Sequence, residues 1–322
     1  MPTVRRLGYL ALILGFAQVV FGAIVRITGS GLGCGDHWPD CYGSFTPTQN
    51  APNLLVEISH RYGAATLSLA IVALVIAAWM KRDEPGVGGA GGPLRSALLA
   101  LALVIVAAVF GAITVKLDLN ALVVATHLAI AMSLLAVLVV TVIRAGGLGA
   151  ATLGNSSGRT QRGARAAVGL TFIALVFGAL TANTPDASAA CQGFPWCRVV
   201  TAHGEPLWIQ ATHRVIAFLL LGHLIGLAIG TSKRNEPRAL RTAAWSALGV
   251  VVLQILVAAA MVEMHLPPSL RSLHQAVGTA LWIAVVAIAA LATRPRTAPA
   301  KTEIVRESPS RGEFATPEGV ST

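Results

Sequence analysis

The chain has 322 residues, of which 55% are hydrophobic and only 12% are charged, and its mean hydropathy is +0.70. Soluble domains usually carry about 25% charged residues, so this composition excludes an ordinary soluble protein and indicates an integral membrane protein. The net charge of +10 could suggest a nucleic-acid-binding protein, but the positions of the basic residues along the chain argue against that.

Apolar runs of about 20 residues, the length that spans a bilayer, recur along the whole chain. We expect eight transmembrane helices, over residues 8–26, 55–80, 95–115, 121–143, 166–183, 207–230, 243–262 and 271–293. The first run is longer than a signal-peptide core and no small-residue cleavage site follows it, which predicts a retained helix. Residues 294–322 are rich in Pro, Ser, Thr, Glu and Arg and predict a disordered cytoplasmic tail.

The basic residues report the orientation of these helices. All but six of the 24 Lys and Arg residues fall on one side of the predicted membrane. By the positive-inside rule this side is cytoplasmic, so we expect both termini inside the cell and the protein in the cell membrane. The six basic residues of the outer half are Arg26, Arg61, Lys116, Arg198, Arg214 and Arg271.

The second half of the chain repeats the first. The segment "VFGAIVRITGSGLGCGDHWPDC" (20–41) resembles "VFGALTANTPDASAACQGFPWC" (176–197), "EISHR" resembles "QATHR", and a further "VFGAIT" begins at Val109. Because each half holds an even number of helices, the repeat is parallel. We therefore predict an all-α membrane protein made of two pseudo-symmetric four-helix bundles, residues 1–150 and 151–293.

Four of the eight histidines occupy equivalent places near the outer ends of the predicted even-numbered helices. They are His60, His127, His213 and His274. Two imidazoles at similar depth on neighbouring helices can face each other across a bundle, which is a geometry for bis-histidine haem ligation. The alternative is that each is a hydrogen-bonded residue of the membrane interface.

Half of the scarce outer cations lie beside these histidines. Arg61 and Arg214 directly follow a histidine, and Arg271 lies one turn before His274. Arginine binds carboxylates bidentately, so the three are candidates for holding haem propionates, with snorkelling toward the interface as the alternative.

All four cysteines lie on the outer side, as Cys34 and Cys41 in one loop and Cys191 and Cys197 in another. An oxidising outer compartment favours one disulfide in each loop. Each disulfide could be a structural staple over the bundle or a redox-active pair.

One difference between the halves stands out, since Glu57 of "EISHR" aligns with Gln210 of "QATHR". Glu57 shares a helix face with His60, and a carboxylate beside a macrocycle can move protons or stabilise positive charge. The first half therefore has the features of a chemical site and the second those of a cofactor site. A salt bridge from Glu57 to Arg61 is the alternative.

The loop and histidine motifs together resemble those of the bacterial haem A synthase family. The resemblance implies an enzyme that oxidises a methyl group of haem O to a formyl group, giving haem A for cytochrome oxidase. It implies a haem b cofactor on His213 and His274, the substrate haem on His60 and His127, and Glu57 as the catalytic residue. It also implies the disulfides Cys34–Cys41 and Cys191–Cys197. The position of the four histidines near the outer ends of their helices predicts haem sites toward the outer face.

Two other functions fit the residues. One is a di-haem membrane cytochrome that exchanges electrons with quinone, and the other is a haem carrier or oxidase assembly factor without chemistry. The partners expected are haem O, membrane lipid, haem O synthase and oxidase assembly proteins. The sequence leaves four points open. They are the electron donor or acceptor, the source of the oxygen atom, whether an axial histidine dissociates, and whether the chain forms a homo-oligomer.

Overall fold

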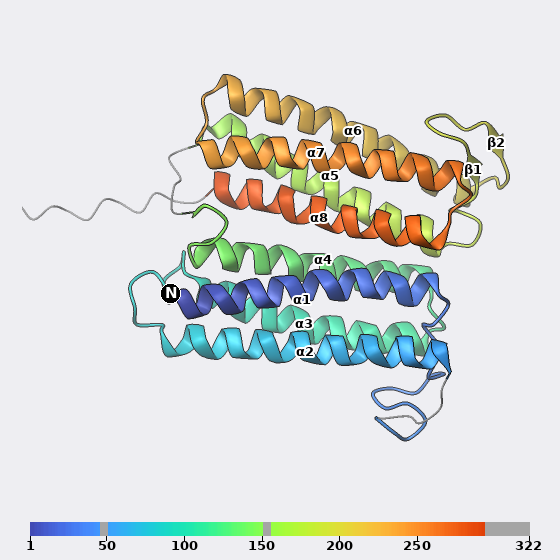
Figure 1. Ribbon diagram of the computed structural model, residues 1–322, viewed down its shortest axis with the longest axis horizontal. Coiled ribbons are helices and arrows are strands. Elements are labelled where there is room, and N and C mark those ends of the chain that lie inside the picture. The colour runs from blue at the N-terminus through green and yellow to red at the C-terminus, as the bar shows by residue number, and fades with distance from the viewer. Residues whose placement is uncertain (46–50, 151–155, 294–322) are drawn as a thin grey trace, which may run out of the picture.

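The computed structural model describes residues 1–45, 51–150 and 156–293. The chain forms eight long helices with a single pair of two-residue strands in the described part of the chain (Figure 1). The helices are α1 Pro2–Ile27, α2 Pro52–Met80, α3 Pro93–Lys116, α4 Ala121–Arg144, α5 Gly158–Asn183, α6 Glu205–Lys233, α7 Arg238–Glu263 and α8 Pro268–Ala292, and the strands are β1 Cys191–Gln192 and β2 Val199–Val200. All eight helices are long and apolar enough to cross a membrane, which confirms the predicted all-α fold with eight transmembrane helices.

The helices begin and end where local sequence dictates. Proline stands in the first turn of α1, α2, α3, α6 and α8, where its missing N–H costs no hydrogen bond. Asn120 and Ser157 cap α4 and α5 by accepting hydrogen bonds from backbone N–H groups of the first turn.

Helix contacts group the chain into its two halves. In the first half α1 packs on α2, α2 on α3, α3 on α4 and α4 on α1, and α5 to α8 make the corresponding contacts in the second half. The halves meet where α4 and α1 pack against α8 and α4 against α5. We call this boundary the seam. Across it the buried Trp282 donates a hydrogen bond from Nε1 to the carbonyl of Met132 at 2.8 Å. The exact pseudo-symmetry of the halves stays a prediction.

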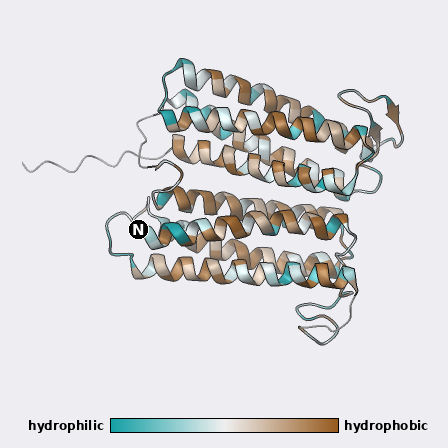
Figure 2. Cartoon of the chain, in the orientation of Figure 1, coloured by the Kyte–Doolittle hydropathy of each residue, from teal (hydrophilic) through white to brown (hydrophobic). Residues whose placement is uncertain are grey.

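Small residues allow the helices to approach closely. Ala97 and Ala100 of α3 and Ala164 and Ala167 of α5 are completely buried, as expected for helices that pack without a hydrophobic driving force in lipid. Large apolar side chains point outward instead, for example Leu69, which is 70% exposed. Hydrophobic residues occupy most of the length of the helices (Figure 2), and the exposed ones among them mark the surface that faces lipid.

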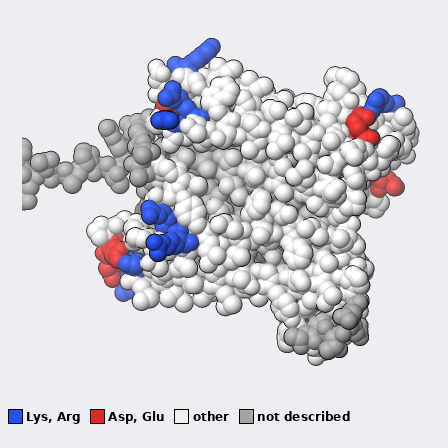
Figure 3. Space-filling model, viewed as in Figure 1, with Lys and Arg blue, Asp and Glu red and all other residues white. Residues whose placement is uncertain are grey.

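The two ends of the helices differ. One end carries the start of α1 and the end of α8, and we call it the basic end. The other carries residues 28–45 and 184–204, and we call it the loop end. On the face seen in Figure 3 charged side chains gather at these two ends and not along the middle of the helices. The predicted tail, 294–322, lies outside the described residues, as do residues 151–155 near the predicted boundary between the halves.

Candidate haem-binding and catalytic site

The four predicted histidines lie within the first three turns of α2, α4, α6 and α8, all of which start at the loop end. Within the first half His60 and His127 are close enough to interact electrostatically, and within the second half His213 and His274 do the same. The structure therefore brings the histidines together as one pair in each half.

A glycine of the repeated VFG motif faces three of these imidazoles. A Cβ on Gly22 of α1 would lie 3.1 Å from Nε2 of His60, and one on Gly178 of α5 would lie 3.0 Å from Cε1 of His213. Gly111 of α3 stands in the same relation to His127, at 3.5 Å. Glycine inside a helix costs stability, so its presence here fits a close approach between helix backbone and ring. The sequence showed this motif as a repeat marker and gave no sign of this role.

The ring nitrogens of the two second-half histidines make different contacts. Nδ1 of His213 lies 3.0 Å from the carbonyl oxygen of Ala174, whereas Nε2 of His274 lies 3.2 Å from the amide nitrogen of Gln254. Gln254 of α7 is a further polar residue that sequence reasoning missed, although a lone glutamine in an apolar run is a signal for a functional site.

Glu57 is buried, with only 4% of its surface exposed, and both of its carboxylate oxygens are bonded. Oε1 accepts from Nη2 of Arg61 at 2.5 Å, and Oε2 accepts from the backbone N–H of Cys34 at 2.9 Å. The structure thus contains the Glu57–Arg61 salt bridge, which is the alternative interpretation of Glu57. The salt bridge and a catalytic role are compatible, because a carboxylate offers about four lone-pair sites and Glu57 uses two.

Gln210 makes the equivalent contact in the second half. Its Oε1 accepts from the backbone N–H of Cys191 at 2.6 Å, and its Nε2 donates to the carbonyl of Ser188 at 3.0 Å. Both residues therefore anchor the first cysteine of the loop above their bundle. The difference between them is charge, because only Glu57 can accept a proton or balance a cation.

The arginines that follow two of the histidines are also bound to these loops. Arg61 donates to the carbonyls of His37, Pro39 and Asp40. Arg214 donates to the carbonyls of Cys191 and Gly193. These contacts fasten each loop over its histidine pair, and the propionate-binding role of both arginines stays a prediction.

The loops themselves are closed by cysteine pairs. Cys34 pairs with Cys41 and Cys191 with Cys197, with Cα atoms 5.0 and 5.2 Å apart. Cys34 and Cys41 are completely buried against Leu54 and Ile58 of α2. The first disulfide is thus part of a small apolar cluster between loop and helix, which suits the role of a staple.

The residues of each pair fit a haem. Two imidazoles are the donor set of a bis-histidine haem. Nδ1 of His274 and Oε1 of Gln254 are buried without a hydrogen-bond partner, and buried polar atoms without partners are uncommon in folded proteins. Across the described ranges no group of three or more His, Cys, Asp and Glu side chains could hold a bare metal ion. The donor set therefore suits a macrocycle that brings its own four nitrogens.

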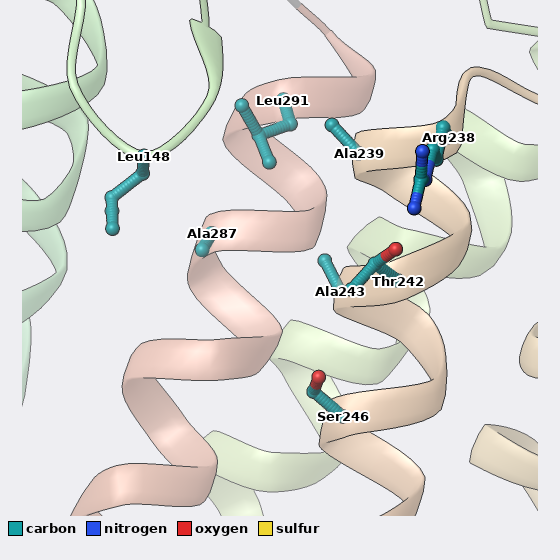
Figure 4. A pocket seen from close by; sticks show the side chains of 8 residues that line it. All are labelled: Leu148, Arg238, Ala239, Thr242, Ala243, Ser246, Ala287 and Leu291. Atoms are coloured by element: carbon teal, nitrogen blue, oxygen red, sulfur yellow. The ribbon is translucent and has the colours of Figure 1, made fainter.

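Two cavities at the surface of the described residues lie far from the histidines. They are at the basic end, about 510 and 570 Å³ in volume, and both are lined by Arg238, Thr242 and Ser246 of α7. The first of them, shown in Figure 4, also borders Leu148 and the end of α8 at Leu291. Neither cavity contains a predicted site residue.

Known proteins match nearly all of the chain. A family model, COX15-CtaA, described as "Cytochrome oxidase assembly protein", matches residues 5–286. The "Heme A synthase" of Bacillus pumilus is 31% identical over 215 residues, which cover 63% of this chain and 66% of that protein. The "Heme A synthase" of Alkalihalophilus pseudofirmus is 29% identical over 287 residues, 85% of this chain and 92% of that protein. That of Geobacillus kaustophilus is 27% identical over 291 residues, 88% and 89% of the two chains. The chain therefore belongs to this family of cytochrome oxidase assembly proteins, the family of the heme A synthases.

Proposed function

We propose that the chain is a haem A synthase that oxidises a methyl group of haem O to a formyl group. The observation that carries the proposal is the pair of histidines in each half beneath a fastened loop, in a chain whose relatives are named heme A synthases. The substrate haem O binds in the first half between His60 and His127, and haem b binds in the second half between His213 and His274.

In this proposal Glu57 is the residue of the chain that takes part in the reaction. It lies one helical turn from His60 on the same face of α2, so its carboxylate borders the substrate. Oxidation of a methyl group releases protons and builds up positive charge at the reacting carbon. A carboxylate with free lone pairs can accept such a proton or balance that charge. Gln210, at the corresponding place beside the cofactor, can do neither.

The remaining residues hold and shield the site. The loops closed by Cys34–Cys41 and Cys191–Cys197 cover the histidine pairs, and Arg61 and Arg214 hold them down. Such covers exclude water from a reacting centre. Haem b, when bound, supplies a redox centre that can pass electrons away from the substrate site.

We place the protein in the cell membrane with both termini in the cytoplasm and the haem sites toward the outer face. The support is the distribution of charge, because most cations gather at the basic end (Figure 3). Haem O synthase and oxidase assembly proteins are the partners that would deliver substrate and take up product.

The test is to express the full chain in a host that makes haem O but no haem A, extract the haems from its membranes and determine their masses. The proposal predicts a formyl-bearing haem that is absent without the chain. Unchanged haem O together with two reducible haems on the purified protein would instead identify a di-haem cytochrome. Unchanged haem O on a protein that shows no redox activity would identify a carrier.

A further inference from the structure

Two arginines lie near each other at the seam on the loop end. Arg26 stands in the last turn of α1 and Arg271 in the first turn of α8, two helices that pack on each other across the seam. Both side chains are half-buried. Arg26 also reaches the third seam helix, since its Nη1 donates to the carbonyl of Ala182 in α5 at 3.1 Å.

Among the described residues, these two cations have no counter-charge. They are close enough to repel each other electrostatically, and neither forms an ion pair with any residue that the structure describes. The other ion pairs of the loop end engage Glu57, Asp36 and Glu263 with different cations. Like charges held together in a partly desolvated place are unfavourable unless an anion joins them.

The position of the pair links it to both histidine pairs. Arg26 lies four residues after Gly22, the glycine that contacts the ring of His60, and Arg271 lies three residues before His274. Residues three or four apart share a helix face. The two guanidinium groups therefore lie about one helical turn closer to the loop end than the substrate-site glycine and the cofactor-site histidine.

We propose that Arg26 and Arg271 form one anion site at the seam, which binds a propionate carboxylate of a haem held by the adjoining histidines. This inference rests on the proposed function, because it needs haem in the histidine sites. Guanidinium groups bind carboxylates through charge-assisted, often bidentate hydrogen bonds. Unlike Arg61 and Arg214, whose guanidinium groups already hold loop carbonyls, the guanidinium group of Arg271 forms no hydrogen bond to the described residues and that of Arg26 forms one.

The test compares haem b with its dimethyl ester, in which both carboxylates are blocked. Both are titrated into the purified full-length chain obtained from haem-depleted cells, and binding is followed by the bis-histidine absorption bands. Arg26→Gln and Arg271→Gln are made singly and as a double variant. A second double variant combines Arg26→Lys with Arg271→Lys. Lys116→Gln is the matched control, because it removes a cation of the same side that is paired with Asp36.

Wild type should bind haem b at least about tenfold more tightly than the ester, as expected when a hydrogen bond between charged groups is lost. The double Gln variant should bind both forms equally, whereas the Lys pair and Lys116→Gln should keep a preference. An ester that binds wild type as well as haem b, or a preference that survives in the double Gln variant, would overturn the assignment.

A lipid phosphate is the other source of an anion at this place. If it is the ligand, vesicles containing phosphatidylglycerol will stabilise wild type more than the double Gln variant while the preference for haem b over its ester is unchanged, and the carboxylate assignment fails. If the wild-type protein makes haem A and binds haem b and its ester with equal affinity, only this inference is contradicted. A wild type that binds neither form contradicts the proposed function as well.

Discussion

Replacing Glu57 by Gln separates chemistry from loop anchoring at a single position. Glu57 accepts from the backbone N–H of Cys34 at 2.9 Å and from Arg61 at 2.5 Å. Glutamine can keep the first of these bonds, because Gln210 makes the same bond to Cys191 in the second half. Glu57→Gln therefore gives the first half the anchor that already works in the second, and it removes the charge together with the ion pair to Arg61.

The expected cost in stability is small. The lost interaction is one charged hydrogen bond, worth about 1.5–3 kcal/mol, and Arg61 keeps three loop carbonyls as acceptors. We expect the lower end of that range and a fall in Tm of about 3–6 °C, using the shift per kcal/mol typical of domains of this size. Loss of a group that accepts a proton in the reaction costs about 100-fold or more in rate, so haem A formation should fall far more than folding.

The assay is the amount of haem A formed per folded protein, with haem content and Tm measured on the same sample. Glu57→Ala is the companion variant, since it removes the charge and the anchor together. If the carboxylate does the chemistry, both variants lose product and only Glu57→Ala also loosens the loop. A Glu57→Gln protein that makes haem A at nearly the wild-type rate would show that Glu57 is only a loop anchor.

Two further substitutions test the surroundings. Gly178→Ala places a Cβ 3.0 Å from the ring of His213 and should lower the haem b content measured by pyridine haemochrome. The control is Gly169→Ala on the same helix, whose Cβ meets nothing within 4 Å and which should leave the haem b content unchanged. Equal haem content in the two variants would refute the role of the glycine. At the basic end, burial raises the pKa of Glu236, but hydrogen bonds from Ser157 and Thr160 and the charge of Arg234 outweigh it and hold the pKa below its usual value of 4.5. The stability this carboxylate contributes is present above its usual pKa and is lost as the pH falls through the lowered one, so Tm should drop more steeply on acidification below 4.5 in wild type than in Glu236→Gln; parallel Tm profiles would contradict this.

The helices could be predicted from sequence, and their ends less well. The apolar runs 8–26 and 243–262 correspond to helices Pro2–Ile27 and Arg238–Glu263, each several residues longer. Hydropathy reports the part of a helix that faces hydrocarbon, while the helix continues into the polar interface until a proline or a cap ends it.

The site could be predicted only where side chains carry the signal. The histidine pairs follow from spacing and repetition, and the Glu57–Arg61 salt bridge from the i,i+4 rule. The carbonyls that bind Arg61 and Arg214 leave no trace in the sequence, because every residue has one. The approach of Gly178 to His213 depends on how α5 and α6 face each other, which the repeat alone does not determine.

The division of labour between the halves is the central claim, and the haem composition of histidine variants tests it most directly. The full chain is purified from a host that makes haem b and haem O, and its haems are separated and weighed. Replacing His213 or His274 by Ala should remove haem b, while replacing His60 or His127 should leave haem b bound and remove haem O and haem A. Loss of the same haem from both sets of variants, or loss of haem b from the first-half variants alone, would contradict the account.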